Sequence, residues 1–311
     1  MRQTWSICKS ELSQLFYSPI AWLIIVIFSF QTYQVFTAEV ASIANDMDLH
    51  GFAENVTYNL FSHYNGVYRN MMSTLYMFIP LLTMGLMSRD MSNGAIKLLY
   101  SSPVTSTQII LGKFLSMVLF SFVMLGVILP AIWFAGARVE NTDYGMIFSG
   151  LAGEFLLFWA YSAIGLFMSC LTGYQIVAAL LTLGALGFLN HLGSMGQEID
   201  FVRDITYWAS LSGRTEQLTA GLISSEDIIY FVIVIALFLL YSIFLLQYKK
   251  NPKKWQCAAK YVGATVAVLA IGYITSRPAM VLYHDATSIQ SNTLTSNSID
   301  VVKNLKGELD I

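Results

Sequence analysis

One acidic side chain interrupts an otherwise apolar stretch of the chain. Glu154 lies within residues 145–170, a run that contains no Lys, no Arg and no second acid. An ionisable group inside a membrane segment is costly, so it usually has a functional or a pairing role. Three environments are open to Glu154: a polar path across the membrane, an ion pair with Arg138 or a neighbouring span, or hydrogen bonds from Tyr or Ser side chains of another helix.

Sequence patterns of the common catalytic sites are missing. No Gly-x-x-x-x-Gly-Lys-Ser/Thr loop is present to hold nucleotide phosphates, and neither His-Glu-x-x-His nor Gly-x-Ser-x-Gly occurs. The four histidines show no ligand spacing, and the three cysteines (Cys8, Cys170 and Cys257) form no CxxC pair. We therefore expect no metal or other cofactor in this chain, and any ATP-driven work would need a second polypeptide.

The composition is that of a membrane protein with several spans. Of the 311 residues, 56% are apolar and 12% are charged, whereas soluble domains carry roughly 25% charged residues. The mean hydropathy is +0.59. A net charge of −2 gives no reason to expect a nucleic-acid partner.

The expected fold class is an all-α polytopic membrane protein. A span needs about 20 mostly apolar residues. Seven such segments are predicted: 20–38, 71–88, 108–134, 145–170, 174–192, 228–248 and 258–275. Pro80 predicts a kink in the second span, and Pro130 lies near the end of the third. The short turn 171–173 predicts a tight hairpin between the fourth and fifth spans.

The N-terminal segment 1–19 predicts an amphipathic helix that lies in the membrane interface. Its apolar residues recur at steps of three and four: Trp5, Cys8, Leu12, Leu15 and Phe16. Polar residues fall between them: Arg2, Lys9 and Glu11. The alternative is that 1–19 forms the first turns of span one, but Pro19 favours a break before that span.

Lys and Arg near the span ends predict the orientation. Ten of them lie on the side of the N-terminus and of the loop after the second span, whereas four lie on the opposite side. The first side is therefore predicted to be cytoplasmic. The N-terminus would then lie inside, and seven spans would place the C-terminus outside.

The most polar stretch in the first half of the chain is 89–113, between the second and third spans. An Asn-Gly pair predicts a turn, Ala95 to Tyr100 a short helix, and Pro103 the end of that helix. Thr105, with Gln108 three residues later, predicts a capping box for the next helix. This spacing fits an ordinary polar connector, and it also fits a surface helix that receives force from a partner.

The same stretch resembles the signature loop of type-2 ABC transporter permeases. The matching residues are Asp90, Asn93-Gly94, Leu98-Leu99-Tyr100-Ser101-Ser102-Pro103-Val104 and Leu111-Gly112-Lys113-Phe114. The usual form has a glutamate, Gly-Thr, Leu-Leu-x-Ser-Pro-Val and then Leu-Gly-Lys. Here Asp90 stands near the glutamate position and Ala95 replaces the threonine. In that family the loop is the cytoplasmic coupling helix that contacts the ATPase subunit.

The resemblance implies a coupling loop at 89–107 and a contact with a separate ABC ATPase, which would hold ATP and magnesium. The residues expected to serve this contact are Arg89, Asp90, Gly94, Lys97, Leu98, Leu99, Pro103 and Lys113. It also implies a six-span core over 20–248, paired with an identical or paralogous second permease in a bacterial inner membrane. The basic linker 249–257 would fix the topology or attract anionic membrane lipid.

Two further segments resemble the gliding-motility subgroup of these permeases. Segment 193–227 carries a Gly-Leu-Ile…Asp-x-x-Tyr-Phe run and predicts an outer re-entrant segment of short helices, interrupted at Gly213. Segment 276–311 follows the seventh span and resembles the opening of an extracytoplasmic auxiliary domain, which we expect to be truncated here. A plain disordered tail is the alternative for 276–311.

The leading interpretation is the permease subunit of an ATP-driven ABC exporter. A secondary transporter would need inverted repeats and several buried ionisable groups, and Glu154 alone qualifies. A membrane scaffold for surface or gliding-type machinery stays open because of segment 276–311. A membrane enzyme is disfavoured because the sequence shows no catalytic grouping.

Overall fold

The computed structural model describes residues 2–51, 55–101, 103–192, 210–250, 254–277, 280–293 and 298. These residues form long helices and one two-stranded sheet. The elements are α1 (Arg2–Tyr17), α2 (Pro19–His50), α3 (Val56–Phe61), α4 (Val67–Thr83), α5 (Gly85–Ser92), α6 (Ala95–Ser101), α7 (Ser106–Leu125), η1 (Gly126–Ile128), α8 (Leu129–Arg138), α9 (Tyr144–Leu171), α10 (Gln175–Leu192), α12 (Leu211–Thr219), β1 (Leu222–Ser224), α13 (Ser225–Lys250), α14 (Lys254–Thr275) and β2 (Tyr283–Asp285).

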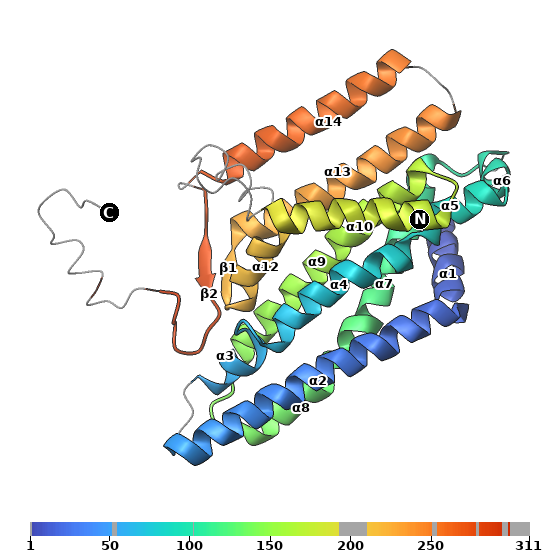
Figure 1. Cartoon of the computed structure of the whole chain (residues 1–311). Helices are drawn as coiled ribbons and strands as arrows, with labels where there is room; N and C mark the ends of the chain where they lie inside the picture. The colour runs from blue at the N-terminus through green and yellow to red at the C-terminus, as the bar shows by residue number, and fades with distance from the viewer. Residues whose placement is uncertain are drawn as a thin grey trace, which may run out of the picture.

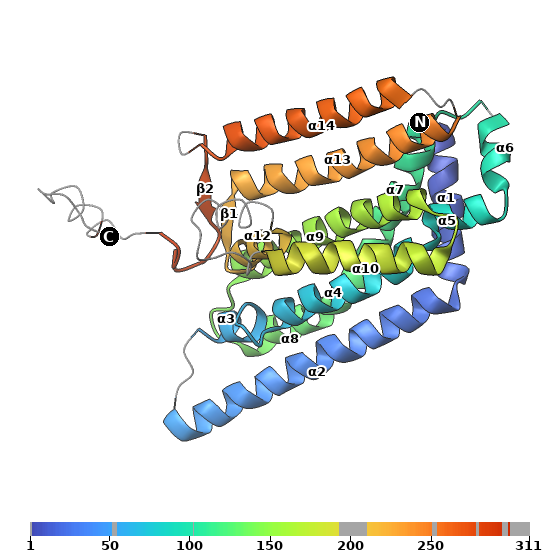
Figure 2. The same cartoon turned by 45° about the horizontal axis from the view of Figure 1, so that its top comes forward.

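The long helices run side by side along one direction, and α1 lies across one of their ends (Figures 1 and 2). Helix α9 is central, because it packs against α4, α7, α10, α12 and α13. Its buried residues extend from Met146 to Cys170, almost the whole length of the helix. We call the end that carries α1, α5 and α6 the α1 end, and the opposite end, with β1 and β2, the sheet end.

Among the residues that the structure describes, five stretches are long and apolar enough to cross a membrane. They are Pro19–His50, Val67–Ser92, Ser106–Arg138, Tyr144–Leu171 and Ser225–Lys250. The apolar helices Gln175–His191 and Ala259–Thr275 are shorter. The predicted all-α polytopic fold class is thereby confirmed, whereas a membrane crossing by each of the two shorter helices stays a prediction.

Three prolines mark places where the helical path changes. Helix α1 ends at Tyr17 and α2 begins at Pro19, which lacks the N–H that a helix interior requires. Pro80 lies near the end of α4, and the chain continues as α5 after Met84. Pro130 lies in the first turn of α8, directly after the 3₁₀ turn η1. The third predicted span therefore consists of two helices joined by a tighter turn.

Two local sequence predictions agree with the structure. Thr105 caps α7: its Oγ1 accepts a hydrogen bond from Gln108 N at 3.2 Å, while Gln108 Oε1 accepts one from Thr105 N at 3.0 Å. The capping box is thus confirmed. The tight hairpin is also present, because α9 ends at Leu171 and α10 begins at Gln175.

The sheet end differs from its prediction. Gly213 does not interrupt a helix but lies in the first turn of α12, where Ser210 Oγ accepts a hydrogen bond from its N–H at 3.3 Å. Next comes strand β1, which pairs antiparallel with β2 in the register Leu222↔Asp285. The first part of the predicted re-entrant segment, 193–209, lies outside the described residues. The segment after α14 is therefore attached, through β2, to the segment before α13.

The turn after β2 is held by Asp285. Its Oδ1 accepts hydrogen bonds from Thr287 N at 3.0 Å and Thr287 Oγ1 at 2.6 Å, and its Oδ2 accepts one from Asn292 N at 2.7 Å. Burial acts to raise the pKa of Asp285, but the hydrogen bonds from Thr287 and Asn292 outweigh it and lower the pKa overall. Ser288 N then donates to Asp143 Oδ2 at 2.8 Å, so this turn is fastened to the start of α9.

The contact between α4 and α9 depends on a residue without a side chain. A Cβ on Gly165 would overlap Thr83 Oγ1 and lie 2.8 Å from Thr83 Cβ. Gly165→Ala should therefore lower the free energy of unfolding by about 1–3 kcal/mol through overpacking. The control is Gly184→Ala on α10, where nothing lies within 4 Å of the added Cβ. That change should be neutral or stabilise by about 0.5–1 kcal/mol, and thermal unfolding in detergent compares the two variants. Equal effects would contradict this packing.

Candidate functional site

A buried lysine joins three elements at the α1 end. Lys113 lies in the second turn of α7 and its side chain is 1% exposed. Its Nζ donates to Glu11 Oε1 of α1 at 2.5 Å and to Asp90 Oδ2 of α5 at 2.7 Å. A charge taken out of water needs paired and hydrogen-bonded partners, and the removal of one partner is strongly destabilising. Lys113 therefore holds both α1 and α5 against α7.

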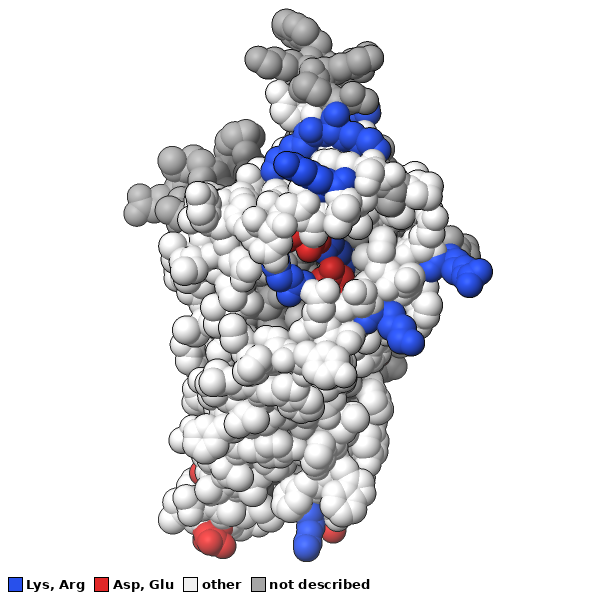
Figure 3. Space-filling model, turned by 90° about the vertical axis from the view of Figure 1, so that its right-hand side faces the viewer, with Lys and Arg blue, Asp and Glu red and all other residues white. Residues whose placement is uncertain are grey.

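Arg89 adds a second cation to this group. Its Nη2 donates to Glu11 Oε2 at 3.3 Å, and its side chain is about one-third exposed. Two cations and two carboxylates thus balance one another. We call Glu11, Arg89, Asp90 and Lys113 the charge cluster. In the space-filling view of the α1 end, acidic atoms show within a hollow near the middle of the face, with Lys and Arg around it (Figure 3).

The packing of α1 agrees with the predicted apolar face at Cys8, Leu12, Leu15 and Phe16 and departs from it at two residues. Trp5 is 57% exposed, whereas Glu11, expected on the polar face, is buried. The reason is that α1 packs lengthwise along α7, where Gly112 leaves room: a Cβ there would lie 2.9 Å from Ile7 Cβ and from the Thr4 carbonyl oxygen. Cys8 is also buried at this contact, and burial raises the pKa of its thiol. Helix α1 is therefore a packed part of the fold and carries an inward-facing carboxylate.

Helix α6 projects beyond the charge cluster. None of its residues is buried, and Leu98 is 74% exposed. Lys97 and Pro103 are exposed as well, whereas Leu99 is half-buried against the core. Gly94, at φ +73°, forms the turn that leads from α5 into α6. Figures 1 and 2 show α6 at the outer edge of the α1 end.

The eight predicted coupling residues therefore fall into two groups. Lys97, Leu98 and Pro103 present free surface, and Gly94 and Leu99 shape and anchor the short helix. The others belong to the charge cluster: Arg89, Asp90 and Lys113. The structure corrects the expectation of direct contact for Lys113, because a buried ammonium group cannot touch a partner protein. Its place is beneath the exposed helix.

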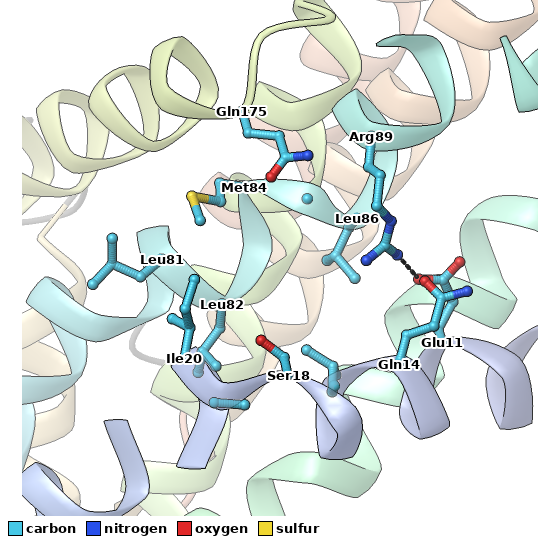
Figure 4. A pocket seen from close by; sticks show the side chains of 13 residues that line it. Glu11, Gln14, Ser18, Ile20, Leu81, Leu82, Met84, Leu86, Arg89 and Gln175 are labelled. Atoms are coloured by element: carbon cyan, nitrogen blue, oxygen red, sulfur yellow. Dashed lines mark hydrogen bonds and ion pairs between the residues drawn. The ribbon is translucent and has the colours of Figure 1, made fainter. Parts of the chain in front are cut away.

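A small cavity borders the charge cluster. It has a volume of about 100 Å³ and lies between α1, the start of α2, the α4–α5 joint and the start of α10. Glu11 and Arg89 line its polar end, while Leu81, Leu82 and Ile20 line its apolar end (Figure 4). Because one water molecule occupies about 30 Å³ of liquid, the cavity has room for a few waters beside the Arg89–Glu11 pair.

A second buried ionic group lies at the sheet end, and the sequence did not single it out as a site. Arg214 of α12 donates from Nη1 to Asp227 Oδ1 at 2.7 Å and from Nη2 to Glu226 Oε1 at 3.0 Å. Its guanidinium lies over the ring of Tyr230, 4.4 Å from the centroid. Ser276, just after α14, donates to Glu226 Oε1 at 2.9 Å. Arg214 thus joins α12, α13 and the end of α14.

Glu154 lies apart from both ionic groups. It is 0% exposed on α9, and neither Oε1 nor Oε2 has a hydrogen-bond partner among the described residues. The pairing with Arg138 and the hydrogen bonds from Tyr or Ser, both considered from the sequence, are therefore absent. Nearby tyrosine hydroxyls donate elsewhere: Tyr68 to the Ile147 carbonyl and Tyr161 to Asn190 Oδ1, each at 2.6 Å.

Within the part of the chain that the structure describes, no three His, Cys, Asp or Glu side chains come together in a way that could hold a metal ion. The charge cluster itself offers two carboxylates, but both are committed to Lys113 and Arg89. The charge cluster therefore acts as a set of ion pairs that joins α1, α5 and α7.

Long apolar helices, a charged crossing helix at one end and an exposed short helix between two spans define a polytopic membrane subunit. Residues 5–284 match the family of ABC-2 family transporter proteins, so the chain belongs to that family. No curated protein gives a significant match. The family supplies the membrane subunit of a transporter and normally works with an ATPase subunit. The type-2 ABC permease prediction is thereby confirmed, while its gliding-motility subgroup stays a prediction.

Removal of the central ammonium group tests the charge cluster. Lys113→Met keeps the volume but leaves Glu11 and Asp90 without their common cation, so we expect the free energy of unfolding to fall by about 3–5 kcal/mol. The control is Lys97→Met on the exposed face of α6, which should change it by less than about 0.5 kcal/mol. Thermal or denaturant unfolding of both variants provides the measurement. Similar stabilities for the two would refute a structural role of the cluster.

Proposed function

We propose that this protein is the membrane permease subunit of an ATP-driven ABC exporter, which forms the path across the membrane and is moved by a separate ATPase. The observation that carries this proposal is the position of α6. None of its residues is fully buried, Lys97 and Leu98 are exposed, and the helix is connected directly to α5 and, through Pro103, to α7. A partner that moves α6 would therefore move the ends of two spanning stretches together.

The charge cluster links these elements directly, so that a movement of α6 would pass to all of them. Asp90 lies on α5, Lys113 on α7, and their contact of 2.7 Å closes the loop that contains α6. Glu11 extends the same network to α1 through its contact with Lys113. Because Lys113 is buried and both of its carboxylate partners are largely shielded from water, displacement of one element leaves a buried charge uncompensated unless the others follow. We infer that α1, α5 and α7 move as one unit.

The direction of insertion follows from the distribution of cations. The α1 end carries Lys97 on α6, Lys249 and Lys250 at the end of α13, and Lys9 on α1. A surplus of Lys and Arg marks the cytoplasmic side of a membrane protein. We therefore place the α1 end in the cytoplasm, where an ATPase with ATP and magnesium can reach α6, and the sheet end outside a bacterial inner membrane.

A second permease and membrane lipid complete the proposed assembly. Helix α10 exposes several large apolar side chains, and α2 exposes others along its first half. These residues are Ile176, Val177, Leu180, Leu181 and Phe188 on α10, and Trp22, Leu23, Val26 and Phe30 on α2. Apolar surface of this extent suits contact with lipid or with a second permease, identical or paralogous. The substrate class and membership of the gliding-motility subgroup are to be tested on the complex with the cognate ATPase.

An exposed leucine on α6 tests the docking proposal. Leu98→Asp should lower the affinity for the cognate ATPase by about tenfold or more, because it places a charge at the centre of the proposed contact. The control is Leu49→Asp at the opposite end of the molecule, on a leucine of similar exposure, 77% against 74%. Co-purification and ATPase activity in the assembled complex are measured for both. Unchanged binding by Leu98→Asp would remove α6 from the interface.

Labelling from one side of the membrane tests the orientation. Lys97→Cys and Leu49→Cys, each in a variant without the native cysteines, place one exposed thiol at each end. In intact cells a membrane-impermeant maleimide should label position 49 and spare position 97, because only the sheet end faces outward. The reverse pattern would place the α1 end outside and would exclude contact with a cytoplasmic ATPase.

A further inference from the structure

Glu154 is sealed between helices rather than exposed to a path. One turn before it, Gly150 of α9 lies against Tyr68 of α4, so close that a Cβ would lie 2.9 Å from Tyr68 Cδ2. Directly before it, Gly153 faces α12, where a Cβ would lie 3.0 Å from Leu218 Cβ. Helices α4 and α12 thus approach α9 closely next to Glu154, whose side chain has no exposed surface.

The cations on the helices packed against α9 are engaged elsewhere. The titratable and charged residues on the elements packed against α9 are Tyr58 (α3), Tyr68, Arg69 and Tyr76 (α4), Arg89 and Asp90 (α5), Lys113 (α7), His191 (α10), Arg214 and Glu216 (α12), and Glu226, Asp227, Tyr230, Tyr241, Tyr248, Lys249 and Lys250 (α13); Tyr144, Tyr161 and Cys170 lie on α9 itself. The cations on α4, α5, α7 and α12 pair with other acids. Lys249 donates to the Cys170 carbonyl at 2.7 Å, at the far end of α9.

The two tyrosines near Glu154 do not donate to it. Tyr68 and Tyr161 both lie close enough to interact with its charge, but their hydroxyls are bound to Ile147 and Asn190. Among the described residues, an ionised carboxylate in this position would have neither a hydrogen-bond donor nor an opposing cation, and it would be shielded from solvent. Such burial costs several kcal/mol even in relaxed proteins, and buried carboxyl groups avoid the cost by taking up a proton.

We propose that Glu154 is a proton-binding site of the closed helix bundle. It holds a proton as a neutral carboxylic acid while α4, α9 and α12 enclose it. When these helices separate and water enters, the O–H bond breaks, the proton passes to water, and the carboxylate keeps the electron pair. The helices can then close again only after a proton returns, so closure of the bundle and proton uptake occur together. This inference rests on the fold alone and does not depend on an ATPase partner.

The protonation state can be observed directly by infrared spectroscopy. Exposed carboxyl groups are ionised at pH 7.5, since the ordinary pKa of Glu is about 4.3. The purified full chain in lipid nanodiscs should nevertheless show the carbonyl stretching band of a protonated carboxylic acid at this pH. Glu154→Gln should lose that band, whereas the control Glu140→Gln, at an exposed acid of the α8–α9 loop, should keep it. If Glu154→Gln does not fold, Glu154→Asp should keep the band at a shifted frequency.

Absence of the acid band in the wild type at pH 7.5 would overturn the proposal. So would a band that persists in Glu154→Gln, or one that appears only after sodium or another metal cation is removed, because the site would then bind that cation instead.

Thermal unfolding gives an independent measurement. The folded protein binds one proton more than the unfolded chain above the ordinary pKa of Glu, so its stability must fall as pH rises. The unfolding midpoint of the wild type should therefore decrease relative to that of Glu154→Gln between pH 5.5 and pH 8.5, and the midpoint of Glu140→Gln should follow the wild type. Parallel midpoints for wild type and Glu154→Gln across this range would contradict the proposal.

Discussion

A charged ammonium group cannot remain unpaired inside packed helices, and Lys113 places that constraint at the point where three elements meet. Its two carboxylate partners come from different parts of the chain, Glu11 from the crossing helix and Asp90 from the end of the α4–α5 stretch. A buried apolar contact tolerates sliding, whereas this pairing requires particular atoms at particular distances. Helix α6 therefore lies between α5 and α7, and the ion pair between Asp90 and Lys113 fixes the relative position of these two helices.

The sheet end obeys the same constraint with a different cation. Arg214 is shared between Asp227 and Glu226, and its ring contact with Tyr230 covers one face of the guanidinium. Between the two ends, the bundle is held by apolar packing around α9. Ionic groups thus fix the helices at both ends, and apolar contacts hold them between. Glu154 is the exception in that middle region, because it is a buried acid whose two oxygens have no hydrogen-bond partner among the described residues.

Much of the fold can be read from the sequence because its signals are local. Long apolar runs, Pro19 and the Thr105–Gln108 pair depend only on residues that are close in the sequence. They therefore predict the observed helices and the cap of α7. The inward position of Glu11 could not be read in that way. In the sequence pattern, Glu11 falls on the polar face of the first helix. It faces the interior because α7 packs closely against α1, which Gly112 permits.

Non-local pairing explains what else the sequence did not reveal. Strands β1 and β2 have three residues each and are about sixty positions apart, and neither carries an alternating apolar pattern strong enough to mark it. Ser210 stabilises the start of α12 through Gly213 N, so a glycine that indicates a break becomes part of a helix. The match to the ABC-2 family ends at residue 284, inside β2, and thus includes α14, which the family resemblance places beyond a six-span core.

The pairing of β1 with β2 makes a closed ring of the last two long helices. At the α1 end, α13 and α14 are joined by the chain itself, and at the sheet end they are joined by a backbone ladder. A ladder uses main-chain N–H and C=O groups, so the ring can persist through many changes of side chain along α14. Helix α14 is accordingly tethered at both ends, which keeps it beside α13.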